Sequence, residues 1–110
     1  MVTTVTSRHF KAHETLVEYA ENAMERLSHY YDGILRCDFI LSYEKARNSV
    51  KSAEIVVTVY RSKLRGIEHS DDYQKSIDGA VAKVKAQLKK YKDKLRAKDR
   101  KVVREVREKV

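Results

Sequence analysis

The sequence predicts an α+β domain, β-α-β-β-β-α, with a mostly antiparallel four-stranded sheet carrying both helices on one face. Three observations support this fold class. Apolar residues recur at three- and four-residue steps in two segments, as in amphipathic helices: 13–31 and 71–95. Apolar and polar residues alternate in four others, as in half-buried strands: 1–8, 34–44, 52–61 and 63–69. Each amphipathic helix has to pack its apolar face against an apolar surface, and the sheet has one apolar face. Both helices are therefore expected on that face.

The first strand and the first helix follow from residue type and spacing. Met1–Arg8 is rich in β-branched residues, which favour strands. In His13–Tyr31 one face is apolar, and glutamates fill the others. The apolar residues are Leu16, Ala20, Ala23, Leu27 and Tyr30. We expect Gly33 to end this helix, because glycine is favoured just after a helix C-terminus.

The middle of the chain predicts three strands. Residues 34–44 and 52–61 are separated by a polar turn at 45–50. Their apolar faces consist of Cys37, Phe39, Leu41 and Tyr43 in the first, and Ala53, Ile55, Val57 and Val59 in the second. The third strand, 63–69, follows a hairpin that lacks the Asn-Gly or Gly-Gly pair favoured in tight turns.

The second helix has the clearest periodicity in the chain. Ser70 is its predicted N-cap, with Asp71 and Asp72 in the first turn. The apolar stripe then runs over about five turns through Ile77, Val81, Val84, Leu88, Tyr91 and Leu95. Only Val102, Val106 and Val110 continue it weakly. We therefore expect a domain at 1–97 and a charged tail at 98–110 that is partly helical or disordered.

Composition excludes several classes of protein. A chain of 110 residues fits one domain. No apolar run approaches the roughly 18 residues of a membrane span, and the N-terminus has no signal pattern. The single cysteine, Cys37, cannot form an internal disulfide. We expect a soluble cytoplasmic protein with no membrane partner.

The sequence shows no catalytic arrangement. There is no Gly-rich phosphate loop, no Ser-His-Asp pattern and no pair of acids placed together. The four histidines are scattered, and Cys37 lies on the apolar face of a strand, where a core role is expected. The sequence thus predicts a protein that is not an enzyme and has no metal, cofactor or small-molecule substrate.

The positive charge is concentrated at the C-terminal end. Residues 1–82 carry a net charge of −1, and residues 83–110 carry +9. The apolar stripe of the second helix is flanked on one side by Lys83, Gln87, Lys90 and Lys94. The other flank and the outward side carry Lys85, Lys89, Lys92 and Arg96. Cations one helical turn apart are about 6 Å from each other and repel. A polyanion would relieve this repulsion, which favours nucleic acid over a membrane surface or a merely solvated face.

Four segments together suggest a family: Val5–His9, Leu27–Asp32, Leu41–Lys45 and, most clearly, Ile77–Leu95 with its Gln-Leu and repeated lysines. They resemble segments of the bacterial ribosome hibernation promoting factors and the related ribosome-associated translation inhibitors. The resemblance covers roughly residues 1–97 and lacks the C-terminal dimerisation domain of the long form, so it indicates a short-type member. The hairpin glycines of the family are replaced here by Arg61-Ser62-Lys63. In outline, the element order also resembles double-stranded-RNA-binding domains.

This resemblance implies a translation inhibitor of stress or stationary phase that binds the small ribosomal subunit. It would occupy the channel of messenger RNA and of the A- and P-site tRNAs, and act by steric block. Carried over position by position, the residues that contact ribosomal RNA are Arg8, His9, Lys83, Lys85, Gln87, Lys89, Lys90, Lys92, Lys94 and Arg96. Two alternatives stay open: a free double-stranded-RNA or tRNA binder, and a protein-docking module using 96–110. Self-association also stays open.

Overall fold

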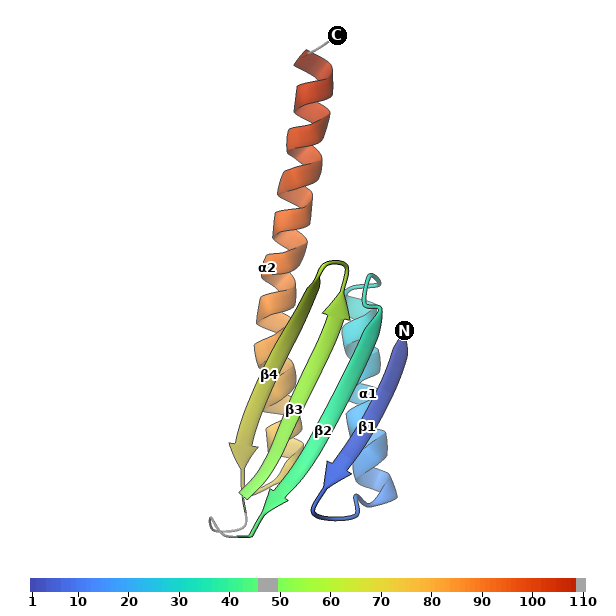
Figure 1. Cartoon of the computed structure of the whole chain (residues 1–110), viewed down its shortest axis with the longest axis vertical. Coiled ribbons are helices and arrows are strands. Elements are labelled where there is room, and N and C mark those ends of the chain that lie inside the picture. Colours follow the sequence, from blue (N-terminus) through green and yellow to red (C-terminus); the bar gives the residue numbers. More distant parts are fainter. Residues whose placement is uncertain (46–49, 109–110) are drawn as a thin grey trace.

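The computed structural model describes residues 1–45 and 50–108, with side chains as far as Ala97. Its elements are β1 (Val2–Arg8), α1 (Glu14–Tyr30), β2 (Arg36–Glu44), β3 (Val50–Val59), β4 (Ser62–Ser70) and α2 (Tyr73–Glu108) (Figure 1). This is the predicted order. The polar turn predicted at 45–50 falls largely on residues 46–49, outside the described residues.

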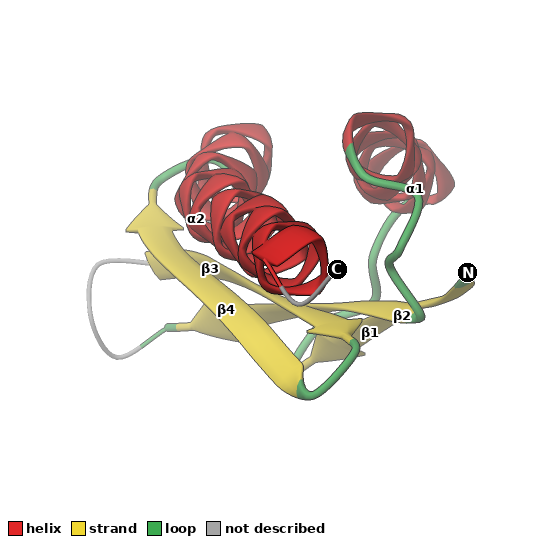
Figure 2. Ribbon diagram, turned by 90° about the horizontal axis from the view of Figure 1, so that it is seen from above, coloured by secondary structure: helices red, strands yellow, loops and turns green. Residues whose placement is uncertain are grey.

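The four strands form one sheet in the order β1-β2-β3-β4. β1 is parallel to β2, and the two other pairs are antiparallel. Both helices cover the same face of the sheet, and no described element covers the other (Figure 2). The predicted α+β fold, with a mostly antiparallel sheet and two helices on one face, is confirmed.

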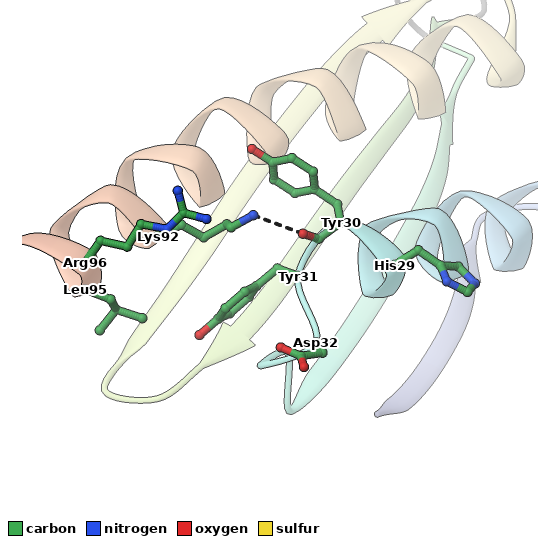
Figure 3. Close-up of a pocket in the computed structure, with 7 residues that line it drawn as sticks. All are labelled: His29, Tyr30, Tyr31, Asp32, Lys92, Leu95 and Arg96. Atoms are coloured by element: carbon green, nitrogen blue, oxygen red, sulfur yellow. Dashed lines mark hydrogen bonds between the residues drawn. The ribbon is translucent and has the colours of Figure 1, made fainter. Parts of the chain in front are cut away.

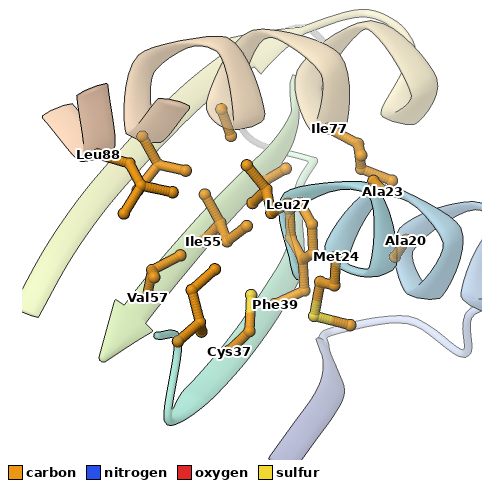
Figure 4. Close-up of a cluster of buried hydrophobic side chains, with 14 of the residues drawn as sticks. Ala20, Ala23, Met24, Leu27, Cys37, Phe39, Ile55, Val57, Ile77 and Leu88 are labelled. Carbon is orange, nitrogen blue, oxygen red and sulfur yellow. The ribbon is translucent and has the colours of Figure 1, made fainter. Parts of the chain in front are cut away.

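The core lies between this sheet face and the helices (Figure 4). Phe39 of β2 stands directly opposite Ile55 of β3, and both are fully buried. α1 adds Ala20, Ala23, Met24 and Leu27, and α2 adds Ile77, Ala80, Val84 and Leu88. Burying one large apolar side chain contributes about 1.5–3 kcal/mol. Because α2 supplies four of these core residues, the core fixes which sides of α2 face solvent.

Gly66 allows α2 to lie directly on β4. A Cβ atom at Gly66 would overlap the backbone carbonyl of Ala80 in α2. Backbone cannot move aside as a flexible side chain can, so any larger residue would push α2 away from the sheet. The position of the basic helix thus depends on this one glycine.

The predicted end of α1 at Gly33 was wrong. The helix ends at Tyr30, and Tyr31 is extended, with φ −147° and its backbone N–H donating to the Leu27 carbonyl at 2.9 Å. None of the three glycines has a positive φ. Gly33 instead makes room for the Tyr31 ring, which a Cβ atom at that position would overlap.

The predicted N-cap of α2 was wrong as well. Ser70 is the last residue of β4, and α2 begins at Tyr73, so neither Asp71 nor Asp72 lies in its first turn. Asp72 is the capping residue, because its Oδ1 accepts a hydrogen bond from the Gln74 backbone N–H at 3.1 Å. The Ser70 hydroxyl donates to the Asp72 carbonyl at 2.6 Å. The extra pairing of β4 with β3 therefore shifts the helix start by two residues.

The backbone of α2 continues beyond the sheet as far as Glu108 (Figure 1). The segment predicted as a separate tail, 98–110, thus begins within this helix, and its last two residues are outside the described part of the chain. The domain boundary at 97 stays a prediction.

Candidate nucleic-acid interface

The predicted cations lie on the solvent-facing sides of α2. Val84 and Leu88 are fully buried, and Val81, Tyr91 and Leu95 are half-buried, as the stripe predicted. The residues exposed beside this stripe are Lys83, Lys85, Lys89, Lys90, Lys94 and Arg96, whereas Gln87 and Lys92 are half-buried. The sheet therefore presents α2 with its basic side chains toward solvent.

Two of the predicted RNA-contacting residues hold the free edge of the sheet. The Gln87 amide donates to the Arg65 carbonyl at 2.7 Å, and its oxygen accepts from the Arg65 N–H at 3.3 Å. The Lys83 ammonium donates to the Ile67 carbonyl at 2.6 Å and lies 3.6 Å from the Glu68 carboxylate. Both side chains thus satisfy backbone groups of β4 that have no neighbouring strand. The helical spacing alone did not reveal this role.

On the other side of α2, two lysines converge on Tyr30 at the end of α1. The ammonium groups of Lys85 and Lys92 lie 4.9 and 4.3 Å from the centre of the Tyr30 ring. Lys92 also donates to the Tyr30 carbonyl at 3.1 Å. This carbonyl is one of the last in α1, where carbonyls lack helical partners and positive charge is favoured. The sequence placed Lys85 and Lys92 on one flank of the second helix, and the fold brings both of them to the end of α1.

The remaining cations extend this surface along α2. We call the basic strip the set Lys85, Lys89, Lys90, Lys92, Lys94 and Arg96. Among the side chains that the structure describes, no carboxylate lies within 4.0 Å of any charged group of the basic strip. These cations are therefore available to a polyanion, which would gain free energy by releasing counterions.

Arg8 and His9 lie at a different place. Arg8 is the last residue of β1 and His9 follows it, near the start of α2, where Phe10 stacks on Tyr73 with ring centres 4.7 Å apart. Arg8 lines a shallow hollow on the sheet face that the helices leave open, together with Ser42 of β2. The basic strip lies farther along α2, in the middle of this helix and away from its start (Figure 1). The structure does not bring Arg8 and His9 together with the other predicted residues.

An open pocket of about 400 Å³ lies where the end of α1 meets α2 (Figure 3). Its lining residues are His29, Tyr30, Tyr31, Asp32, Lys92, Leu95 and Arg96. Burial and the neighbouring Tyr91 raise the pKa of Tyr31, so its phenol stays neutral. Only Lys92 and Arg96 of these residues were predicted as site residues, because Leu95 belongs to the apolar stripe and the four residues at the end of α1 are remote in sequence.

The comparison with known protein families gives a match over residues 3–96, to the family described as Sigma 54 modulation protein / S30EA ribosomal protein. The chain belongs to this family. The match includes β1 to β4 and the part of α2 that carries the basic strip. The family resemblance inferred from the sequence is confirmed.

Solved structures of similar proteins support the same assignment. A ribosomal subunit interface protein from Coxiella burnetii is 26% identical, with a TM-score of 0.76, and the match covers 84% of this chain and 99% of that one. The N-terminal domain of Protein Y from Thermus thermophilus is 27% identical, with a TM-score of 0.72, and the match covers 83% and 99%. The comparison with curated proteins found no significant match.

The only cysteine of the sequence lies in the core. Cys37 is fully buried, and burial raises the pKa of its thiol to about 12, so it is a core residue as predicted. Among the described side chains, those of residues 1–45 and 50–97, no group of three could hold a metal ion. No helix in those ranges combines the length and apolar character needed to span a membrane.

Proposed function

We propose that this protein binds the small ribosomal subunit and inhibits translation by placing its basic strip against ribosomal RNA. The observation that carries the proposal is the basic strip itself, whose cations have no carboxylate partner among the described side chains. Membership of a family named for a ribosomal protein, and likeness to a ribosomal subunit interface protein, support the ribosome as the polyanion.

The scaffold makes this strip rigid before it meets RNA. α2 is held to the sheet by buried apolar residues, by the close approach at Gly66 and by the bonds of Gln87 to β4. A helix fixed in this way loses little conformational entropy on binding. The cations supply affinity, and the shape of the domain selects the site on folded RNA.

The proposed inhibition is occupancy of the channel used by messenger RNA and the A- and P-site tRNAs. A row of exposed cations along a helix suits a groove lined by phosphates, and blocking that groove needs no chemistry on the RNA. The protein would then work in the cytoplasm, where ribosomes are.

Co-sedimentation with purified small subunits tests the proposal. We expect the triple variant Lys89→Glu, Lys90→Glu, Lys94→Glu to lose binding, because it replaces three exposed cations of the strip. The matched control is Lys11→Glu, Lys45→Glu, Lys63→Glu, which makes the same charge change at exposed positions outside α2. Equal binding by both variants, each with a native circular dichroism spectrum, would count against the proposal.

Occupancy of the channel needs a separate experiment. Subunits saturated with this protein should fail to bind initiator tRNA and messenger RNA, and an excess of both should displace the protein. Simultaneous binding of all three would leave ribosome binding intact and refute the steric mechanism.

The alternative of a free double-stranded-RNA or tRNA binder makes a different prediction. Such a module would bind naked duplex RNA as tightly as intact subunits at the same salt concentration. We expect a clear preference for the assembled particle, since family membership points to the ribosome.

A further inference from the structure

We propose that the pocket between the end of α1 and α2 binds a single unpaired RNA nucleotide, with the base against Tyr31 and the phosphate on Lys92 and Arg96. This inference rests on the proposed function and adds to it a specific contact within the RNA-binding surface. The pocket measures about 400 Å³, within the range of sites that hold small molecules.

The lining combines two kinds of group that a nucleotide needs together. Tyr31 and Leu95 supply apolar surface, and Lys92 and Arg96 supply positive charge (Figure 3). A simple anion would not need the aromatic side chain, and an apolar ligand would not need the cations. Proteins that hold single-stranded RNA use this same combination, because bases stack on aromatic rings while cations follow the backbone.

Tyr31 is fixed in place before any ligand arrives. Its ring meets the ring of Tyr91 edge-on, with centres 5.9 Å apart, and the Tyr91 hydroxyl donates to the Tyr60 carbonyl at 2.9 Å. On another side the ring lies over Gly33, where no Cβ atom would fit. An aromatic side chain held in this way gives stacking energy without an entropic cost of ordering it.

The charges around the pocket set the direction of the nucleotide. Asp32 is exposed and lines the pocket too, so a phosphate is repelled from its carboxylate and attracted to Arg96 and Lys92. Lys92 is already directed there by its bond to the Tyr30 carbonyl at 3.1 Å. The base then lies toward Asp32, whose carboxylate accepts hydrogen bonds from base N–H groups.

Nuclear magnetic resonance titration of the full chain tests this pocket. The probes are guanosine 5′-monophosphate and adenosine 5′-monophosphate, compared with guanosine, which lacks the phosphate, and ribose 5-phosphate, which lacks the base. We expect the nucleotides to shift the amides of 29–32 and 92–96, and to bind at least about fivefold more tightly than either fragment. Ribose 5-phosphate binding as tightly as the nucleotides would overturn the proposal, as would the absence of shifts at these amides.

Two variants test whether nucleotide binding depends on the pocket, without disturbing the fold. Arg96→Gln removes an exposed guanidinium and should weaken nucleotide binding several-fold while the spectrum stays native. Lys63→Gln, with the same charge change on β4, should leave nucleotide binding unaltered. If both variants weaken nucleotide binding equally, the effect is one of overall charge, and the proposed nucleotide site is wrong.

The outcomes also distinguish the pocket from ribosome binding. In one outcome, nucleotides do not bind, the wild-type protein sediments with subunits, and the triple strip variant does not. The nucleotide site is then wrong, and the proposed function holds. If the triple strip variant sediments normally, the proposed function fails whatever the titration shows.

Discussion

The side-chain amide of Gln87 forms two hydrogen bonds with the backbone of Arg65, one to its carbonyl and one from its N–H. A neighbouring strand would bond β4 at the same two groups. An unpaired edge strand is a template for pairing with another chain, so Gln87 protects this edge while it holds α2 in place. The predicted RNA-contacting residues of α2 therefore divide into two that bond β4, Lys83 and Gln87, and those of the basic strip, which have no carboxylate neighbour among the described side chains.

We expect Gln87→Ala to lower the free energy of unfolding by about 1–2 kcal/mol, because two hydrogen bonds are lost and the Arg65 backbone loses its partner. Binding to ribosomal subunits should change little. Urea denaturation followed by circular dichroism measures the first effect, and co-sedimentation the second. The control is Gln74→Ala, an exposed glutamine in the first turn of α2. A loss of subunit binding without a loss of stability would mean that Gln87 contacts RNA.

Replacing Gly66 by alanine should destabilise the domain by about 2 kcal/mol or more, because the new methyl group overlaps the Ala80 backbone carbonyl. Gly79→Ala is the matched comparison. Its Cβ atom would lie 2.6 Å from the Glu68 side chain, which is flexible and can move. Alanine also favours the helix by about 1 kcal/mol. Thermal unfolding should therefore rank Gly66→Ala far below wild type and Gly79→Ala near it, and equal losses would contradict the packing argument.

The Cys37 thiol should resist modification in the folded protein. Burial raises its pKa to about 12, so almost no thiolate, the reactive form, is present at pH 8. In the unfolded chain the pKa returns to about 8.5. As the pH rises from about 8.5 toward 12, the unfolded state loses this proton first, so the thiol's contribution to stability decreases. Labelling with a thiol reagent should be slow until urea unfolds the chain, whereas rapid labelling of the native protein would show that Cys37 is accessible.

The sequence predicted those parts of the molecule that depend on local periodicity. The alternation around Phe39 and Ile55 placed both in the core, and the stripe through Val84 and Leu88 oriented α2 correctly. Helix ends were predicted less well. Glycine is a common residue at the end of a helix, but Gly33 instead leaves space for the Tyr31 ring.

The site was predicted as a list of cations without their partners. Lys92 donates a hydrogen bond to Tyr30, and Gln87 donates one to Arg65. Both bonds join segments that are distant in sequence. Which flank of the helix faces α1 and which faces β4 depends on the packing of the whole sheet. For the same reason, spacing alone could not show that Arg8 lies away from the basic strip.

The lysine that bonds β4 and the exposed lysines of the basic strip should differ in how they change the salt dependence of ribosome binding. Each phosphate contact adds about 0.7–0.9 to the slope of log affinity against log salt concentration. Lys89→Gln and Lys94→Gln should each reduce the slope by about that amount, because their ammonium groups are exposed and have no carboxylate neighbour among the described side chains. Lys83→Gln should leave the slope unaltered, since its ammonium bonds the Ile67 carbonyl and pairs with Glu68.

Filter binding of labelled small subunits across a salt series measures these slopes. A smaller slope for Lys83→Gln, equal to that of Lys89→Gln, would mean that the Lys83 ammonium leaves β4 when RNA binds. The polyanion would then also contact the residue that bonds β4, and the separation of Lys83 from the basic strip would be wrong.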